Sequence, residues 1–510
     1  MNENLYAILA SRFPADPAAP CLILPDGRSI GYGELDRASA RYANLLASAG
    51  TEKGDRIAVQ VEKSPEALFL YLGCVRAGRV FLPMNPAYEA REVAYFLKDA
   101  QPSLFVCRPG ALDEARVLAR ETGVARVHTL GVRGEGSLTE LAAQMPERFE
   151  TAGCARGDLA AILYTSGTTG RSKGAMLSHG NLSANALVLH RYWGFRAGDV
   201  LLHMLPIFHV HGLFVATHCA LLNASPMLFE PKFDARRALE LFSRATVFMG
   251  VPTYYTRLLG SDGLDRKACA NMRLFICGSA PLLPETFREF RRRTGHTILE
   301  RYGMTETGML ASNPWEGERR EGTVGLPLPG TELRVVGDDD RPLACAVPGH
   351  IQVRGESVFS GYWRMPEKTR EEFTEDGFFR TGDMGQVDAD GYLAIAGRSK
   401  DLIITGGLNV YPKEIEALID AMPGVAESAV IGLPHPDFGE AVTAVVVRSR
   451  DGVQATAGAI LSALRGNLAA FKIPKAVVFT DELPRNTMGK VQKNVLRSRY
   501  SGERAADPQR

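Results

Sequence analysis

The sequence predicts an α/β fold in two parts: a large N-terminal domain with mixed and parallel sheets covered by helices, and a small α+β domain at the C-terminus. At 510 residues, the chain is too long for one hydrophobic core. Strands and helices alternate along its N-terminal part, which is the pattern of a parallel sheet. Around Arg398 the composition changes, because GRSKDLIITGGLNVYPKEIE brings charge, paired glycines and proline together. We therefore expect a domain boundary there.

The elements of the large domain follow from apolar runs and from the residues that end them. Two helices with apolar side chains at helical spacing end at Gly50 and Gly78, where C-cap glycines belong. The strand after the second helix stops at Pro83 and Pro86. In chain order we expect a helix at 30–49, a strand at 54–61, a helix at 65–77, strands at 80–86 and 103–109, a helix at 112–122, and strands at 125–132 and 159–163.

The pattern after the boundary predicts a compact α+β domain of about a hundred residues. Its expected elements are a helix at 413–421, strands at 426–432 and 442–448, a helix at 456–470 and a strand at 476–480. The last ten residues, SGERAADPQR, are polar and predict disorder.

Composition excludes several classes of protein. Hydrophobic content of 45% and a charged fraction of 23% are ordinary for a soluble globular protein. A net charge of +1 argues against nucleic-acid and anionic-membrane partners, which need a concentrated basic surface. The eight cysteines form no CysXxxXxxCys pair, so neither a zinc site nor a disulfide framework is expected. No signal peptide and no run of 18 apolar residues is present, and we expect a cytoplasmic protein.

The apolar stretch 200–230 contains four histidines, at positions 203, 209, 211 and 218. Four imidazoles so close together could suggest a metal site. No nearby Cys, Asp or Glu has ligand spacing with them, however, and imidazoles often line cavities. We therefore expect cavity residues here.

The segment 164–174, YTSGTTGRSKG, has the composition of a phosphate-binding loop. Its glycines let backbone N–H groups turn toward an anion, its hydroxyls donate hydrogen bonds, and Lys173 adds charge. A Walker A loop is excluded, because Lys173 is preceded by Ser172 and followed by Gly174. A flexible linker is the alternative, but a linker has no use for the apolar strand that precedes this segment. The sequence predicts a nucleotide triphosphate as ligand.

At this loop the chain resembles the adenylate-forming family of acyl-CoA synthetases, luciferases and adenylation domains of peptide synthetases. In that family the loop embraces the β- and γ-phosphates of ATP. The resemblance implies a large adenylate-forming domain at 1–397, a hinge at 398–401 and a small mobile domain at 402–510 that carries the catalytic lysine.

Further segments resemble the same family, in the same order. In RYGMTET, Tyr302 offers a ring for adenine, Thr305 a hydroxyl for the α-phosphate and Glu306 a carboxylate for Mg²⁺, which one or two carboxylates and phosphate oxygens hold. The resemblance adds Thr165 beside the metal. The residues that it assigns to ATP or AMP are Thr165, Ser166, Gly167, Thr168, Thr169, Gly170, Lys173, Gly278, Ser279, Ala280, Glu300, Tyr302, Gly303, Met304, Thr305, Asp383 and Arg398.

Two of these residues, Asp383 and Arg398, could have a structural role in place of a role in nucleotide binding. Asp383, in FFRTGDMG, resembles the aspartate that accepts hydrogen bonds from both ribose hydroxyls, and a carboxylate has two oxygens suited to this geometry. Arg398 would hold ribose or phosphate. Asp383 could instead cap a turn, and Arg398 could form a surface ion pair. Their place in series with the phosphate loop favours the functional roles.

Near the C-terminus, Lys490 follows Gly489 in PRNTMGKVQK, a basic loop that composition alone would assign to a solvated tail. The resemblance makes Lys490 the catalytic lysine, together with His209, Thr305 and Glu306. A cation beside an in-line transition state offsets the charge that spreads over the phosphate oxygens. Acetylation of Lys490 would remove this charge, so the residue is a reasonable target for control.

The second half-reaction of the family is attack by the coenzyme A thiol on the acyl adenylate. The thiol needs the place that the lysine had occupied. The resemblance implies that the small domain swings about Lys400 and brings Gly406 and Gly407 against the pantetheine channel. Paired glycines suit a backbone that lies close to a narrow tunnel.

The acid substrate depends on the acyl pocket. In GVPTYYTRLL, Arg257 lies on an expected helix, at the depth where a substrate tail would end. An unpaired cation in an apolar pocket needs an anion, which a second substrate carboxylate would provide with help from Ser279. A surface arginine paired with an acidic neighbour is the alternative.

Several motifs resemble the malonyl-CoA synthetases of this family, namely HVHGLF, MGVPTYYTRLL, GSAPLL, ERYGMTET, FSGYWRMPEKT and ELPRNTMGK. The resemblance implies malonate, with methylmalonate as a second substrate, held by Arg257 and Ser279 and enclosed by Val210, His209 and Met309. The sequence thus predicts an ATP-dependent acid–thiol ligase that produces malonyl-CoA, AMP and pyrophosphate. A synthetase for short-chain or aryl monocarboxylates is the nearest alternative. A nucleotide sensor and a phosphotransferase are further ones.

Overall fold

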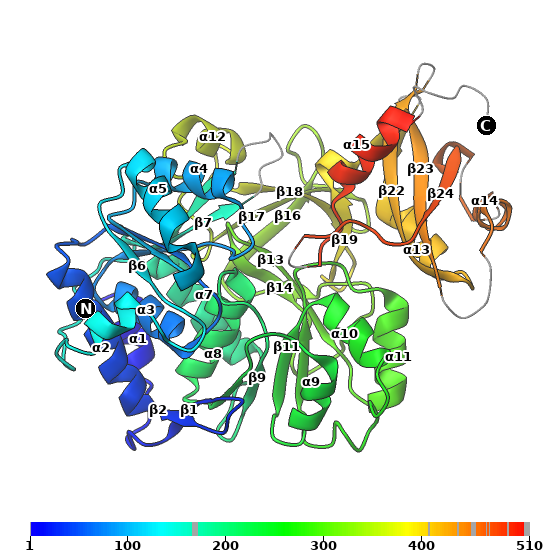
Figure 1. Ribbon diagram of the computed structural model, residues 1–510. Coiled ribbons are helices and arrows are strands. Elements are labelled where there is room, and N and C mark those ends of the chain that lie inside the picture. Colours follow the sequence, from blue (N-terminus) through cyan, green and yellow to red (C-terminus); the bar gives the residue numbers. More distant parts are fainter. Residues whose placement is uncertain are drawn as a thin grey trace.

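The computed structural model describes residues 2–165, 172–405, 408–435, 438–449, 455–465, 467–468, 470–486 and 489–503. Figure 1 shows a large body that contains the N-terminus and a smaller body that carries the C-terminal elements. The large body is built on two open sheets and a small antiparallel one. Of the helices described, none is both long and apolar enough to cross a membrane.

A six-stranded sheet in the order β6-β5-β3-β4-β7-β8 forms the first half of the large body. All its pairs are parallel except β7 with β8, which are antiparallel. Its strands are β3 (Arg56–Gln60), β4 (Val80–Pro83), β5 (Leu104–Cys107), β6 (Val127–Thr129), β7 (Leu159–Thr165) and β8 (Lys173–Ser178). The helices of this half are α1 (Leu5–Ala10), α2 (Tyr32–Ser48), α3 (Pro65–Arg76), α4 (Ala90–Ala100), α5 (Leu112–Thr122) with the 3₁₀ turn Pro109–Ala111 before it, α6 (Ser137–Ala142) and α7 (His179–Tyr192).

A nine-stranded sheet in the order β15-β14-β13-β12-β11-β9-β10-β1-β2 forms the second half. Its centre is parallel, and antiparallel strands close both edges. The strands are β1 (Pro20–Ile23), β2 (Ser29–Gly31), β9 (Leu201–His203), β10 (Met227–Phe229), β11 (Val247–Gly250), β12 (Leu274–Cys277), β13 (Leu299–Met304), β14 (Gly308–Ser312) and β15 (Leu326–Pro327). The helices are the π-helix His211–Ala216, α8 (Thr217–Leu222), α9 (Ala235–Leu241), α10 (Pro252–Leu259) and α11 (Pro284–Thr294).

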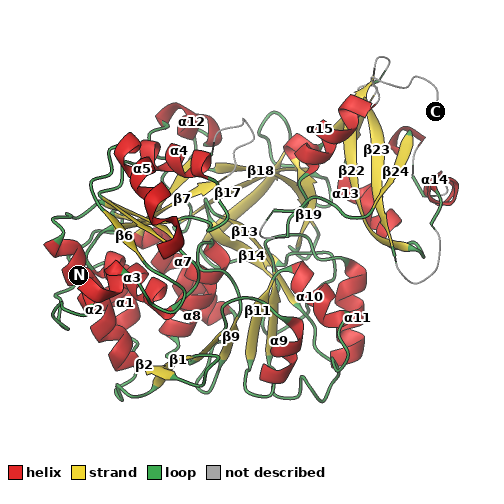
Figure 2. Cartoon of the chain, in the orientation of Figure 1, coloured by secondary structure: helices red, strands yellow, loops and turns green. Residues whose placement is uncertain are grey.

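The core clusters arrange these elements in layers (Figure 2). Side chains of α4 and α5 pack on one face of the six-stranded sheet. Helices α2, α3, α7 and α8 fill the space between the two large sheets. Helices α9, α10 and α11 cover the other face of the nine-stranded sheet. A parallel sheet has both faces covered in this way, as the alternating sequence pattern predicts.

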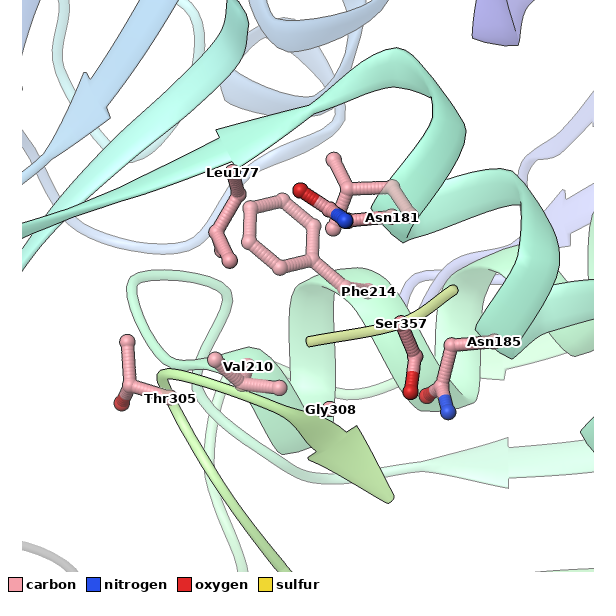
Figure 3. Close-up of a pocket in the computed structure, with 9 residues that line it drawn as sticks. Leu177, Asn181, Asn185, Val210, Phe214, Thr305, Gly308 and Ser357 are labelled. Atoms are coloured by element: carbon pink, nitrogen blue, oxygen red, sulfur yellow. The ribbon is translucent and has the colours of Figure 1, made fainter. Parts of the chain in front are cut away.

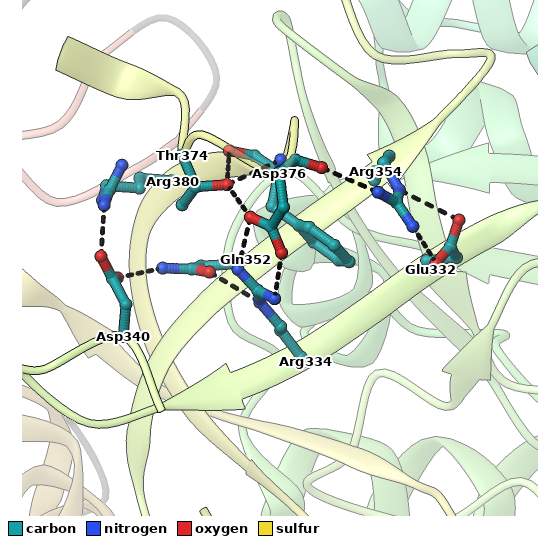
Figure 4. Close-up of polar contacts among 9 residues, drawn as sticks. Glu332, Arg334, Asp340, Gln352, Arg354, Thr374, Asp376 and Arg380 are labelled. Carbon is teal, nitrogen blue, oxygen red and sulfur yellow. Dashed lines mark hydrogen bonds and ion pairs between the residues drawn. The ribbon is translucent and has the colours of Figure 1, made fainter. Parts of the chain in front are cut away.

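A four-stranded antiparallel sheet follows, formed by β16 (Thr331–Val336), β17 (Gly349–Gly355), β18 (Phe379–Val387) and β19 (Leu393–Arg398), with α12 (Pro366–Glu372) inserted before β18. A network of ion pairs and hydrogen bonds covers part of it (Figure 4). Arg334 contacts both carboxylate oxygens of Asp376 at 2.7 and 3.0 Å, and Gln352 donates to Asp340 at 2.5 Å. Polar side chains thus link β16 and β17 to each other and to the segment before β18.

The small body is a sheet of five strands in which β21-β20-β23-β22 are antiparallel and β24 pairs in parallel with β23. Its elements are β20 (Ile403–Thr405), β21 (Leu408–Val410), α13 (Pro412–Asp420), β22 (Val425–His435), β23 (Gly439–Arg448), α14 (Ala457–Arg465), the 3₁₀ turn Ala470–Lys472, β24 (Ala476–Thr480) and α15 (Lys493–Glu503). The expected elements are present here, although both long strands extend beyond their expected ends. Its buried apolar side chains form clusters of their own. The last seven residues lie outside the described ones.

Candidate active site

The proposed metal-side groups lie together, although they come from different sheets. Thr165 ends β7 and Glu306 follows β13, and the Thr165 hydroxyl donates to Glu306 Oε1 at 3.2 Å. The Tyr362 hydroxyl donates to the same oxygen at 3.1 Å. Glu306 is buried, with 5% of its surface exposed. A hydroxyl and a carboxylate at one point form a donor set that suits Mg²⁺ when phosphate oxygens complete it.

The residues expected at adenine and ribose also meet. The Tyr302 hydroxyl donates to Asp383 Oδ2 at 2.5 Å, and Arg398 Nε lies 2.8 Å from Asp383 Oδ1. Asp383 and Arg398 face each other across the pair β18–β19, so the sheet register sets this contact. Burial, followed by the charge of Asp383, raises the pKa of Tyr302 well above its usual value. The phenol therefore stays protonated and acts as a donor.

Close backbone contacts surround these groups. A side chain at Gly303 would place its Cβ 2.2 Å from the Gly308 carbonyl oxygen, so only glycine fits. Ser279 adopts φ +76°, a left-handed conformation that non-glycine residues rarely adopt outside functional sites. Gly278 and Ala280 flank it. Glu300, two residues before Tyr302, is buried, and burial raises its pKa to about 8.

The phosphate loop is described only at its ends. Lys173 is buried, its Nζ lies 3.2 Å from Glu372 Oε1, and it stacks over the Tyr362 ring at 4.1 Å. Because Tyr362 also contacts Glu306, the lysine lies next to the metal-side groups. The predictions for Ser166, Gly167, Thr168, Thr169 and Gly170 concern positions outside the described residues.

Lys490 lies in a turn that brings the small body against the large one. Asn486 N–H donates to the Lys490 carbonyl, and Lys490 N–H donates to Asn486 Oδ1, both at 2.9 Å. Gly489 has φ +75°, and a Cβ there would lie 3.0 Å from Thr253 Oγ1 at the start of α10. Burial, followed by the charge of Arg398, lowers the pKa of Lys490 to about 8. The lysine therefore lies near the expected ribose-binding pair, and not in a solvated tail.

The expected hinge is held on both sides of Lys400. The Ser399 hydroxyl lies 3.1 Å from the Gly382 carbonyl oxygen, which belongs to the large body. On the other side, Arg497 of α15 donates to Asp401 Oδ1 at 2.8 Å. Lys400 itself is exposed, and partial desolvation of its ammonium group lowers its pKa. Each neighbour of Lys400 is thus tied to a different body.

The expected coenzyme A face lies around Gly406 and Gly407, which are outside the described residues. The residues that flank them carry exposed apolar side chains, since Ile404 is 52% and Leu408 48% exposed. Phe438, near the adjacent end of β23, is 39% exposed. An apolar patch on this edge is available for a second contact.

The residues expected to enclose the acyl pocket lie directly before the π-helix, at His209 and Val210, and on β14, at Met309. Val210 and Met309 are buried, and His209 Nδ1 lies 3.3 Å from the His211 amide. A cavity extends from this point (Figure 3), and its wall is formed by Leu177, Asn181, Leu182, Asn185, Val210, Phe214, Thr305, Gly308 and Ser357. Because Thr305 and Val210 share this wall, the expected α-phosphate hydroxyl and the acyl wall border the same space.

The prediction that Arg257 closes a buried pocket is wrong. Arg257 lies in α10, as expected, but its side chain is exposed. It is one helical turn from Thr253, so both residues share the face of α10 that meets the Gly489 turn. The reason is the orientation of α10, whose buried face is formed by Tyr255 and Leu258. Arg257 is thus placed at the junction of the two bodies.

A different arginine is buried beside Ser279, a residue expected in the acyl pocket, and we call this pair with the neighbouring imidazoles the floor. Arg301 is 3% exposed, and its Nη2 lies 3.4 Å from Ser279 Oγ. Its Nε has no hydrogen-bond partner, and no Asp or Glu among the described residues forms an ion pair with it. Burial lowers its pKa to about 10, so it stays charged at neutral pH. A Cβ at Gly278 would lie 2.5 Å from Arg301 Cζ, so the glycine makes room for the guanidinium.

Two imidazoles complete this floor. His211 is buried, and its Nδ1 lies 3.3 Å from Ser279 Oγ. Its Nε2 has no hydrogen-bond partner. Burial and then the positive charge of Arg301 lower the pKa of His209 to about 4 and that of His211 well below its usual value. Both rings are therefore neutral beside a positive guanidinium, and the floor carries a net positive charge.

The sequence does contain a signal for Arg301. In LERYGM the residues alternate between the two faces of a strand, so Arg301 and its neighbours Glu300 and Tyr302 point to opposite sides. Since a strand between two others in a covered sheet has no exposed face, a charge on it must be paired or functional. The motif RYGMTET contains Arg301, but the resemblance assigns no role to this residue.

The comparisons with known proteins fit this geometry. Residues 9–363 match the AMP-binding enzyme family, and residues 414–490 match the AMP-binding enzyme C-terminal domain. The chain belongs to the AMP-binding enzyme family. The two matched segments correspond to the two bodies in Figure 1, which accounts for a fold of a large α/β part and a small α+β part.

Among members of this family, the malonate–CoA ligase of Arabidopsis thaliana is 36% identical, over 93% of this chain and 85% of the relative. The crystal structure of ATP-bound MatB from Rhodopseudomonas palustris is 55% identical and superimposes with a TM-score of 0.96 over 98% of this chain and 99% of that one. The apo form of the same protein superimposes with a TM-score of 0.86, at the same identity and coverage. The arrangement of this AMP-binding enzyme is thus more similar to the ATP-bound form.

Proposed function

We propose that this chain joins malonate to coenzyme A through an acyl adenylate and produces malonyl-CoA, AMP and pyrophosphate. The observation that carries the substrate assignment is Arg301, a buried guanidinium beside Ser279 that pairs with no acidic group in the part of the chain that the structure describes. The similarity to a malonate–CoA ligase along most of the chain supports the same assignment. The cytoplasm, with its pools of ATP and coenzyme A, is the proposed location.

In the first step, one malonate carboxylate oxygen attacks the α-phosphorus of ATP, and pyrophosphate leaves. Asp383 and Tyr302 would hold the ribose and adenine, and Thr305 the α-phosphate. Thr165 and Glu306 would hold Mg²⁺, which offsets charge on the leaving phosphates. Lys490 would donate hydrogen bonds to the oxygens on which negative charge increases.

The second malonate carboxylate would bind Arg301, assisted by the hydroxyl of Ser279. Guanidinium and carboxylate groups match in a bidentate geometry. A monocarboxylate would leave the buried cation unpaired, which costs several kcal/mol. Buried Val210 and Met309 keep the pocket short, so a three-carbon diacid fits better than a long one. The neutral His209 and His211 would line the path between the two carboxylates.

In the second step, the thiol of coenzyme A attacks the acyl carbonyl, and AMP leaves with the electron pair of the broken carbon–oxygen bond. We place the hinge of this step at Lys400, between residues 1–397 and 402–510. Turning there would remove Lys490 and bring the face near Gly406 and Gly407 to the site. The exposed Ile404 and Leu408 support this rotation, because it would give their side chains a partner surface.

A panel of carboxylates with pyrophosphate release as readout tests the function. We expect malonate to be the best acid, methylmalonate to be accepted, and butyrate and benzoate to be poor. For Arg301→Leu, kcat/KM for malonate should fall by about a hundredfold or more, because one partner of a buried charge pair is lost. Activity on butyrate should not fall. Arg301→Lys, which keeps the charge, should retain more malonate activity than Arg301→Leu.

Two outcomes would overturn the assignment. If butyrate or an aryl acid turns over better than malonate in the unmodified protein, the chain is a monocarboxylate synthetase with the same two steps. If ADP is produced in place of AMP, the chain is a phosphotransferase. A nucleotide sensor would release no pyrophosphate with any acid.

A further inference from the structure

The loop that lines the acyl pocket contains a π-helix, His211–Ala216, directly before α8. The Thr217 N–H donates to the Gly212 carbonyl, five residues back, where an α-helix would use the residue four back. One extra residue is thus inserted into this turn. Because each residue of an α-helix rotates its side chain by about 100°, the insertion decides which side chains face the pocket.

Two side chains also donate to the Gly212 carbonyl oxygen. The Thr217 hydroxyl lies 2.9 Å from it, and His203 Nε2 lies 3.0 Å from it. Both side chains are buried, with at most 1% of their surface exposed. A carbonyl oxygen with two side-chain donors beside its backbone donor has a strongly fixed position.

The contacts of His203 show which of its two ring nitrogens carries the proton. Lys63 Nζ lies 2.8 Å from His203 Nδ1 and 2.8 Å from the His203 carbonyl oxygen. A backbone carbonyl only accepts, so His203 Nε2 must carry the hydrogen that reaches Gly212, and Nδ1 accepts from Lys63. Lys63 follows β3 of the six-stranded sheet, whereas His203 ends β9 of the nine-stranded sheet. The chain of donors therefore crosses between the two large sheets.

The backbone around Gly212 is tightly packed. A Cβ at Gly212 would lie 2.0 Å from the Pro206 carbonyl oxygen, so no other residue fits. Lys63 is buried against the Phe229 ring, with its Nζ 4.2 Å from the ring centroid. Burial lowers the pKa of Lys63 well below its usual value, and the charge of Glu230 opposes this shift. Glu230 also pairs with Arg237 at 3.1 Å.

We infer that Lys63, His203 and Thr217 are positioning residues for acid selection, because they hold the π-turn that places His211 and Val210 in the acyl pocket. None of them touches the pocket floor formed by Ser279 and Arg301. They act through the Gly212 carbonyl, which precedes the buried wall residue Phe214 by two positions. The inference rests on the proposed malonate activity.

Thr217→Val and Thr217→Ser form the matched test pair. Valine has the shape of threonine without the hydroxyl donor, whereas serine keeps the donor. For Thr217→Val we expect KM for malonate to rise by about tenfold, the change typical of one lost hydrogen bond, and KM for ATP to stay within about twofold. Thr217→Ser should stay within about twofold for both constants. Thermal unfolding of each variant reports whether the fold is intact.

A second pair keeps the test decisive if Thr217→Val does not fold. His203→Gln retains an N–H donor toward Gly212, and His203→Leu does not. We expect malonate KM to rise more in His203→Leu than in His203→Gln, and the ratio of kcat/KM for malonate to that for methylmalonate to change only in the leucine variant.

The outcomes separate this inference from the proposed function. If the unmodified protein uses malonate but the variants change KM for malonate and ATP equally, or neither, the three residues have only a structural role and the inference is wrong. If the unmodified protein does not use malonate, the proposed function fails first. The split between the two KM values is the readout that a general loss of stability would not produce.

Discussion

The nucleotide side of the active site and the floor of the acyl pocket are built in different ways. The nucleotide groups come from separate parts of the chain, with Thr165, Asp383 and Lys490 in three different sheets or turns. The floor groups Ser279 and Arg301 lie at neighbouring strands of one sheet, where Cys277 of β12 pairs with Glu300 of β13. A rotation of the small body would change the first set and leave the second unchanged. We therefore expect a rotation of the small body to alter the catalytic groups without altering which acid is selected.

The largest effect is expected for Lys490→Ala, which should affect the catalytic groups and not the choice of acid. Adenylate formation, measured as pyrophosphate release, should fall by about a thousandfold, because a charge that stabilises the transition state is lost. Thioester formation from supplied malonyl adenylate should change little. Lys232→Ala, at an exposed lysine, serves as control. An equal loss in both half-reactions would show that Lys490 also serves the second step.

The pH profile gives the next largest effect. The protonated lysine is the active form, and the pKa of Lys490 is lowered to about 8. Adenylate formation should therefore be constant below this pKa and fall by about tenfold per pH unit above it. Malonate binding should stay constant over the same range, because the pKa of Arg301 is about 10. In Lys490→Arg the fall should vanish, and its persistence would assign the titration to another group.

Lys400→Pro tests the boundary between the two regions. Proline fixes φ and removes a backbone donor, so rotation at this residue should be hindered. We expect thioester formation to slow by about tenfold, with adenylate formation less affected, since the structure already holds Lys490 near the nucleotide groups. Lys400→Ala is the control for loss of the side chain. Unchanged turnover in the proline variant would place the hinge elsewhere.

The smallest effect is expected for Arg257→Ala. Because Arg257 is exposed, KM for malonate should rise by less than about fivefold, as for other exposed charges. Comparison with Arg301→Leu, under the same conditions, sharpens the distinction between the floor and the junction of the two bodies. A larger effect at Arg257 than at Arg301 would reverse the assignment of the second carboxylate.

The same comparison explains what the sequence could predict. The groups expected to bind phosphate, ribose and metal lie in short contiguous motifs. In the structure they meet as pairs, Thr165 with Glu306, and Asp383 with Tyr302 and Arg398. The composition and the order of these motifs were sufficient to predict these groups, because each motif is a short loop whose local sequence determines its conformation. The alternation of strands and helices likewise predicted the covered parallel sheets.

The acyl pocket could not be predicted in this way, because it depends on burial. Arg257 and Arg301 are both single arginines within apolar segments, and only packing shows that one is exposed and the other enclosed. The π-turn at Gly212 is equally hidden, since an inserted residue leaves no periodic pattern. Tertiary packing, and not local propensity, decides both features.

The ties on either side of Lys400 have a consequence for the motion itself. Ser399 is bonded to Gly382 of the large body, and Asp401 to Arg497 of the small one. Any reorientation that keeps both bonds must fall on the two backbone torsions of a single residue. We therefore expect the proposed rotation to occur about one pivot, the φ and ψ torsions of Lys400, without sliding of the small body.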